Sequence, residues 1–142
     1  MKHAERAFDR LAQAPAVWVT VDAAQGSVPR DAGTWMAVFA DAVVGTVGGG
    51  HVEFQAIALA RRRLAGERGE AMVRFALGPS LGQCCGGVMF LRLERVDAAS
   101  VPDLRARLAQ QRLPVAVFGG GHVGQALVDV LARLPFALRW ID

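Results

Sequence analysis

The two cysteines of the chain are adjacent, at Cys84 and Cys85, inside a glycine-rich stretch that predicts a loop. A thiolate is a soft metal ligand and a nucleophile in persulfide chemistry. Two cysteines alone cannot complete a structural zinc site, and a disulfide between neighbouring residues would be strained. The pair therefore either handles a metal or sulfur, or consists of inert buried thiols. Gly86 and Gly87 slightly favour Cys85, because they let a bulky ligand approach it.

Residues 119–124 read Gly-Gly-Gly-His-Val-Gly and satisfy the G-x-G-x-x-G pattern of dinucleotide-binding turns. They follow a predicted strand and open a predicted helix, and the next strand ends at Asp142. In this pattern Gly119 makes the tight turn, Gly121 lets the backbone approach a pyrophosphate, and Gly124 lets helix and strand pack closely. Asp142 would accept hydrogen bonds from ribose hydroxyls, which favours NAD over NADP. The alternative is a glycine-rich turn without a nucleotide.

A similar run, Gly48-Gly49-Gly50-His51-Val52, occurs earlier in the chain, also between a predicted strand and a predicted helix. Backbone amides in such a turn can cradle a phosphate. His51 would either donate to that ligand or cap the helix. Glu53 stands where the dinucleotide pattern has its third glycine, so we do not infer a true repeat. A carboxylate in the first turn also suits the helix dipole without any ligand.

The arginines are spread among acidic residues rather than gathered in one stripe, and the net charge is only +3. This distribution argues against a nucleic-acid partner. The run Arg61-Arg62-Arg63 predicts a solvated helix end. Arg30, which follows Pro29 in a glycine-containing stretch, either clamps an anionic group through its two-pronged guanidinium or pairs with Asp31.

The composition is that of a globular protein, with 53% hydrophobic and 20% charged residues in 142. The N-terminus carries an acid early and lacks a following apolar run, so we expect no signal peptide. The least charged stretch contains Asp41 and several glycines, which predicts strands and turns rather than a membrane span. We therefore expect a soluble, cytoplasmic protein without a membrane partner.

Hydrophobic periodicity and turn residues predict alternating helices and strands. The expected helices cover residues 2–13, 51–65, 97–112 and a segment after 121, and the expected strands cover 17–21, 34–40, 43–47, 70–76, 88–96, 114–118 and 136–141. The second helix is expected to bury Phe54, Ile57, Ala60 and Leu64, and the last helix Val123, Leu127, Val130, Leu131 and Leu134. Trp18, Trp35 and Trp140 are expected in the core.

This order predicts an α/β protein in two parts. A mixed α+β N-terminal domain, residues 1–96, is followed by a helical connector, residues 97–113, and a partial (truncated) Rossmann-like βαβ unit, residues 114–142. Two parallel strands and one helix cannot cover both faces of a sheet. We therefore expect either that the chain is a fragment or that a second copy completes the exposed edge in a homodimer.

Three glycine-containing stretches, taken together, identify a family resemblance. They are residues 26–33, 45–53 and 77–87, and in this order and spacing the chain resembles the XdhC/CoxI family of xanthine dehydrogenase accessory factors. The resemblance extends to Gly119–Gly124 and to Trp140-Ile141-Asp142. It implies a protein that binds molybdenum cofactor, supports its sulfuration and delivers it to an apo-enzyme of the xanthine dehydrogenase type, with a cysteine desulfurase as sulfur source.

The resemblance implies a carrier without catalytic residues of its own, and it gives the candidate residues roles toward this cofactor. Cys84 and Cys85 become possible molybdenum ligands, and Gln83 a hydrogen-bonding partner of the pterin. Two other functions stay open. One is an oxidoreductase that uses NAD or FAD in the C-terminal unit, although no acid–base set accompanies the glycine pattern. The other is a structural module that joins two N-terminal domains.

Overall fold

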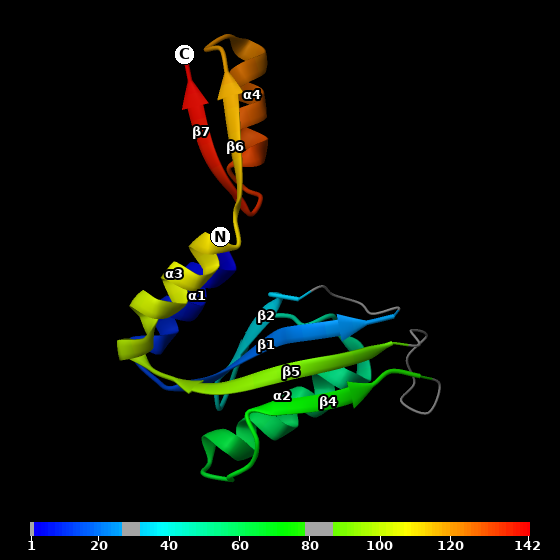
Figure 1. Cartoon of the computed structure of the whole chain (residues 1–142). Coiled ribbons are helices and arrows are strands. Elements are labelled where there is room, and N and C mark those ends of the chain that lie inside the picture. The colour runs from blue at the N-terminus through cyan, green and yellow to red at the C-terminus, as the bar shows by residue number, and fades with distance from the viewer. Residues whose placement is uncertain (1, 27–31, 79–86) are drawn as a thin grey trace. The chain divides into compact units, whose positions relative to one another are not determined.

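The computed structural model describes residues 2–26, 32–78 and 87–142, and in these it forms two compact units (Figure 1). We call His3–Ala99 the N-terminal unit and Ser100–Asp142 the C-terminal unit. The elements of the first are α1 (Lys2–Leu11), β1 (Ala16–Gln25), β2 (Trp35–Val38), β3 (Val43–Gly45), α2 (Gly50–Leu64), β4 (Met72–Ala76), β5 (Val88–Val96) and the 3-10 turn η2 (Ala98–Ser100). Those of the second are α3 (Val101–Gln110), β6 (Leu113–Phe118), α4 (His122–Leu131) and β7 (Phe136–Ile141). The expected mixed α/β class is confirmed.

The N-terminal unit is built on a five-stranded antiparallel sheet in the order β3-β2-β1-β5-β4. Strand β1, the longest of the five, lies at the centre. Val19 pairs with Met36 of β2 on one side and with Leu93 of β5 on the other. A bulge between Val21 and Ala23 shifts the register toward the end of β1.

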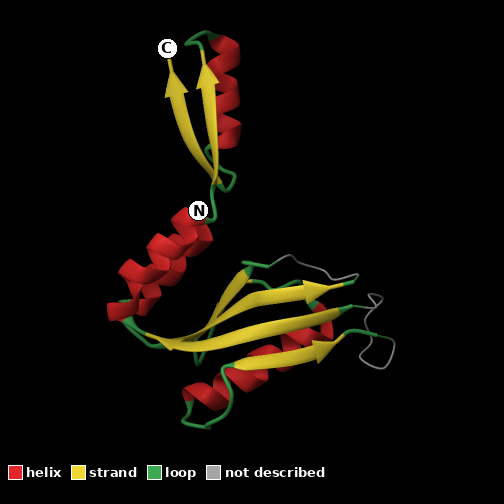
Figure 2. Cartoon of the chain, in the orientation of Figure 1, coloured by secondary structure: helices red, strands yellow, loops and turns green. Residues whose placement is uncertain are grey.

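Helix α2 packs along one face of this sheet, as Figure 2 shows. Its buried residues are Val52, Ala56 and Ala60. The expectation that Phe54 faces the core is wrong, since this side chain is 70% exposed. The alanines have the smallest side chains available to a helix face, so they let the α2 backbone approach the sheet closely and turn Phe54 toward solvent. Ile57 and Leu64 pack at the margin of the core.

The opposite face of the sheet carries an aromatic stack. The ring of Trp18 lies 4.2 Å from that of Trp35 and 6.3 Å from that of Phe8 on α1, with near-parallel planes. Trp18 is buried, which confirms its expected core position, whereas Trp35 is half-buried. The stack anchors α1 to the sheet.

The C-terminal unit contains a parallel pair, β6 and β7, joined through α4. The expectation that α4 and both strands are buried is wrong for the described chain: Phe118, Val123 and Val130 are 61–74% exposed. Leu127, Leu134 and Trp140 are also more than 40% exposed. Two strands and one helix bury only the surfaces that face each other, so the second apolar side of α4 and the open face of the pair have no covering layer here.

Within the described residues, none of the helices combines the length and the apolar character needed to cross a lipid bilayer.

Candidate functional site

Two of the glycine-containing segments connect to strands at the same end of the sheet in the N-terminal unit. Val88, the first residue of β5, pairs with the last residue of β1, Gln25, and with the last residue of β4, Ala76. The chain between β1 and β2 and the chain between β4 and β5 therefore start side by side, as Figure 1 shows. The backbone bond from Leu77 N–H to the Gly87 carbonyl, at 2.8 Å, closes the base of the second segment.

The third segment, Gly45–Gly50, emerges at this same end. Strand β3 runs antiparallel to β2, so its last residue, Gly45, lies opposite Met36 near the start of β2. The Thr46 N–H donates to the Trp35 carbonyl at 3.2 Å and extends this pairing. Helix α2 then begins at Gly50. Sheet topology thus brings together the described ends of three stretches that are far apart in sequence, and we call this the glycine end of the sheet.

The turn at residues 48–50 is organised by the carboxylate of Glu53. Its Oε1 accepts from the Thr46 hydroxyl at 2.5 Å, from the Val47 N–H at 2.9 Å and from the Gly49 N–H at 3.3 Å. The Gly48 N–H donates to the Thr46 hydroxyl at 3.0 Å. All three glycines of the turn have φ between +69° and +125°, a conformation that other residues rarely adopt.

This arrangement changes how the predicted phosphate cradle would work. The carboxylate already occupies the position in which amides at a helix start would hold an external anion. The amides of Val47, Gly48 and Gly49 are therefore engaged within the protein. A role for Gly48, Gly49 and Gly50 toward a ligand stays a prediction, and it would require Glu53 to give up acceptor bonds. Glu53 itself holds the turn in place.

His51 is exposed at the start of α2, and its ring lies 6.4 Å from that of Phe54 with an angle of 20° between the planes. Together they form an exposed aromatic surface next to the glycine turn. The sequence indicated His51 but not Phe54. The expected burial of Ala60 is confirmed, and the missed signal was Ala56, which lies one turn before Ala60 and extends the buried face toward Val52 instead of Phe54.

Four predicted site residues, Arg30, Gln83, Cys84 and Cys85, lie outside the described residues. Among the described residues, no group of three or more His, Cys, Asp or Glu side chains is arranged to hold a metal ion.

The remaining candidates lie in the C-terminal unit, around the turn between β6 and α4. The Gly119 carbonyl accepts from the Trp140 indole N–H at 2.9 Å, and the Gly119 N–H donates to the Ile141 carbonyl at 2.9 Å. A Cβ on Gly124 would collide with the Gly119 carbonyl oxygen, so this glycine is what lets α4 approach the turn. A Cβ on Gly120 would collide with the Asp142 carboxylate. Asp142 and Gly119–Gly124 therefore lie together, whereas Gly121 has open space around it.

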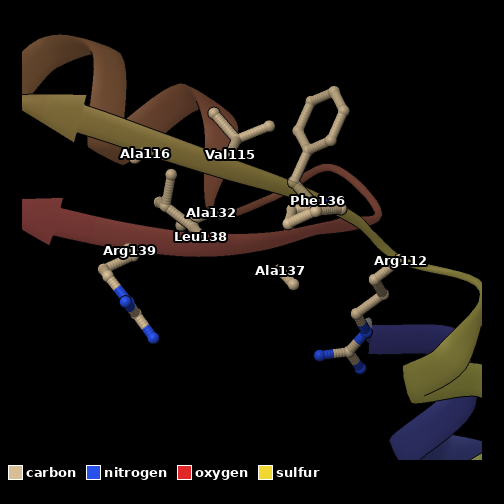
Figure 3. Close-up of a pocket in the computed structure, with 9 residues that line it drawn as sticks. Arg112, Val115, Ala116, Ala132, Phe136, Ala137, Leu138 and Arg139 are labelled. Atoms are coloured by element: carbon tan, nitrogen blue, oxygen red, sulfur yellow. The ribbon is translucent and has the colours of Figure 1, made fainter.

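A concave surface of about 710 Å³ in this unit lies away from the turn (Figure 3). Arg112, Ala132 and residues of β6 and β7 line it, and Gly119–Gly124 do not. In the close-up, Ala137 and Arg139 point to the side of the strand pair opposite Phe136. This surface includes the open face of the pair rather than the predicted nucleotide turn.

Residues 10–76 match the model of the XdhC and CoxI family. This segment is similar to that family. The XdhC and CoxI segment contains two of the three stretches at the glycine end of the sheet, residues 26–33 and 45–53, together with most of the β1–α2 scaffold that positions them. The third stretch, residues 77–87, begins directly after the matched range.

The fold is also found in a crystal structure described as a xanthine dehydrogenase from Bacillus halodurans. The TM-score is 0.70 at 17% sequence identity, and the likeness covers 99% of this chain. This chain spans 62% of the length of that protein. The shared architecture therefore extends beyond the XdhC and CoxI segment into the C-terminal unit. No curated protein sequence matches the chain.

Proposed function

We propose that the chain is an accessory protein for an enzyme of the xanthine dehydrogenase type and carries molybdenum cofactor as cargo at the glycine end of the sheet. The family of residues 10–76 supports an accessory role in general. The observation that carries the cofactor-specific proposal is the convergence of three glycine-containing segments on one sheet end. We place this role in the cytoplasm, where thiols stay reduced.

The residue types at this end suit the chemistry of the cargo, which combines a pterin dithiolene, a phosphate and a molybdenum centre. Thiolates are suitable soft donors for the metal, and the segment that bears Cys84 and Cys85 starts and ends here. Arg30 lies in the segment between β1 and β2, and its guanidinium group can bind the phosphate through two parallel hydrogen bonds. Since Glu53 engages the amides of the turn, we assign it to shaping the site rather than to contacting the cargo.

The same proposal includes two protein partners, an apo-enzyme that receives the cofactor and a cysteine desulfurase that supplies sulfur. Persulfide chemistry requires an accessible thiolate, which gives Cys84 or Cys85 a second use. Pull-down of the purified chain with the desulfurase, before and after alkylation of both thiols, separates this use from metal binding. Loss of the interaction upon alkylation is the expected result.

The decisive experiment is a titration with molybdenum cofactor under reducing, oxygen-free conditions. The wild type is compared with a Cys84→Ala/Cys85→Ala variant and with Ser80→Ala, a control in the same segment without a thiol. We expect the wild type and the control to bind and the double variant to lose at least tenfold in affinity, about 1.4 kcal/mol. Equal binding by all three proteins would exclude the cysteines, and no binding by folded wild type would overturn the proposal.

A second candidate function, nucleotide binding by the C-terminal unit, is favoured by the Asp142 carboxylate lying against Gly120. Trp140 is a built-in probe, because its indole N–H bonds to the carbonyl of Gly119 in the same turn. We expect NAD or FAD to quench Trp140 fluorescence in a Trp18→Phe/Trp35→Phe background, and Asp142→Asn to weaken NAD binding. Unchanged fluorescence at millimolar NAD and FAD would rule this function out.

A further inference from the structure

A cleft of about 360 Å³ lies at the other end of the N-terminal unit, away from the glycine end of the sheet. Its apolar floor is Val17, near the start of β1, and Leu93, near the end of β5. The turn between α2 and β4 forms its wall. The charged side chains that line it are Arg63, Glu67, Arg68 and Arg95. Three arginines from three parts of the chain thus line one small cavity.

Part of this positive charge serves the end of α2 and the turn that follows it. Arg95 Nη1 donates to the Leu64 carbonyl at 2.7 Å, and Arg63 Nη1 donates to the Glu70 carbonyl at 2.9 Å. Such bonds satisfy backbone oxygens and complement the negative end of the helix dipole. They explain why arginines gather here, but with the described residues Arg63 and Arg95 each use only one guanidinium nitrogen.

The arginines that line the cleft have more free N–H donors than the described lining residues offer acceptors. Arg63 Nε is shielded from solvent and has no hydrogen-bond partner among the described residues. Arg68 is exposed and forms no hydrogen bond or ion pair with any described residue. Among the described residues that line the cleft, the one carboxylate is that of Glu67, which is bonded to Arg62 at 3.1 Å. The lining therefore carries an excess of positive charge and an orphaned buried donor.

Gly69 keeps the cleft open. A Cβ at this position would collide with the Arg63 guanidinium. Its φ lies outside the positive range, so backbone conformation alone does not require glycine here. The absence of a side chain is instead what leaves room for the guanidinium beside the wall.

From these contacts we propose that the cleft binds a small oxyanion of the phosphate or sulfate class. A tetrahedral oxyanion supplies the several acceptors that Arg63 and Arg68 lack, and guanidinium forks match its geometry. The anion also neutralises the mutual repulsion of the three arginines. The site is separate from the glycine end of the sheet, so it stands or falls independently of the proposed carrier function.

The test uses the full chain and NMR amide shifts recorded during titration with sodium phosphate, with sodium chloride of equal ionic strength as reference. We expect saturable shifts at Gly69 and Leu93 with phosphate and with sulfate, and not with chloride. Glycerol 3-phosphate tests whether the cleft also binds phosphate esters. Saturable shifts of the Gly69 and Leu93 amides with this compound would assign the site to esters as well as to the free ion. Absence of saturable shifts with phosphate and sulfate would overturn the proposal.

Variants decide whether the cleft residues carry the binding. Arg68→Gln removes an exposed charge without a described partner, and we expect phosphate affinity to fall about tenfold. Arg74→Gln, on β4 outside the cleft, is the matched control and should leave affinity unchanged. Gly69→Ala should weaken binding by displacing Arg63. Equal affinity in Arg68→Gln and wild type would contradict the assignment.

Discussion

The Thr46 hydroxyl donates to the Glu53 carboxylate at 2.5 Å, and this bond distinguishes two turns that begin with the same five residues. Gly-Gly-Gly-His-Val is followed by Glu53 in the first turn and by Gly124 in the second. In the first turn, the Glu53 carboxylate accepts the hydrogen bonds that an external anion would otherwise accept. Gly124 instead lets α4 approach the Gly119 carbonyl oxygen. The residue at this one position thus decides whether a side-chain carboxylate accepts hydrogen bonds from the amides of the turn.

Replacing Glu53 with alanine should destabilise the N-terminal unit. The Val47 and Gly49 amides and the Thr46 hydroxyl would lose their acceptor in a partly buried position. We expect the free energy of unfolding to fall by about 2 kcal/mol, as measured by urea denaturation. Glu67→Ala, which removes an exposed ion pair, is the control and should cost below about 1 kcal/mol. Equal losses in both variants would refute the network.

Gly124→Ala should loosen the C-terminal unit and leave the N-terminal unit intact. The new methyl group would collide with the Gly119 carbonyl oxygen, so α4 must move away from the turn. Hydrogen exchange should show faster exchange in β6, α4 and β7, with protection of β1 and β5 unchanged. Gly121→Ala, where a Cβ has open space, serves as the comparison and should have little effect. Unaltered exchange in Gly124→Ala would show that the close approach is not needed.

Trp18→Ala should be among the most destabilising single substitutions in the chain. It removes a buried indole and breaks the stack with Trp35 and Phe8. We expect a loss of about 3–5 kcal/mol in the free energy of unfolding. Trp140→Ala removes an indole that is 42% exposed and should cost about half as much or less. A smaller effect at Trp18 than at Trp140 would contradict the assigned packing.

The apolar surface of the C-terminal unit leads us to predict self-association. Phe118, Val123, Leu127 and Val130 are 47–74% exposed, and the open face and edges of a two-stranded sheet accept further partners. Sedimentation equilibrium should therefore show a homodimer. Phe118→Asp and Val130→Asp should shift it toward monomer, whereas Phe54→Asp, an exposed apolar position of the N-terminal unit, should not. A monomeric wild type with full amide protection in β6 and β7 would rule this out.

Local pattern was sufficient for most elements because their signals are local. The alternating residues of 88–96 and the β-branched run that opens β1 predicted strands where the structure has them. The glycine stretches marked turns at positions that require positive φ, as at Gly48. Family resemblance was likewise readable, since motif order and spacing are properties of the sequence alone.

Burial was predicted less well, because it depends on what lies opposite each face. Phe54 and Val123 both sit on apolar helix stripes, yet both are exposed. Ala60 is buried as expected, but Val52 and Ala56 complete the buried face of α2 in place of Phe54. Among the described residues, α4 has too few neighbouring elements to cover its second side. Periodicity identifies the apolar faces of a helix, but the element that packs against the helix decides which face is buried.

The sequence by itself determined the elements, the glycine turns and the residue types with the right chemistry, since each follows from local sterics and side-chain identity. Only the tertiary structure decided that three distant segments share one end of a sheet, because strand order sets which chain ends are neighbours. It also decided that Glu53 engages the amides of its own turn and that Arg63, whose Nε has no partner among the described residues, lines a cleft at the other end. Those relationships depend on through-space distances, which residue spacing along the chain does not encode.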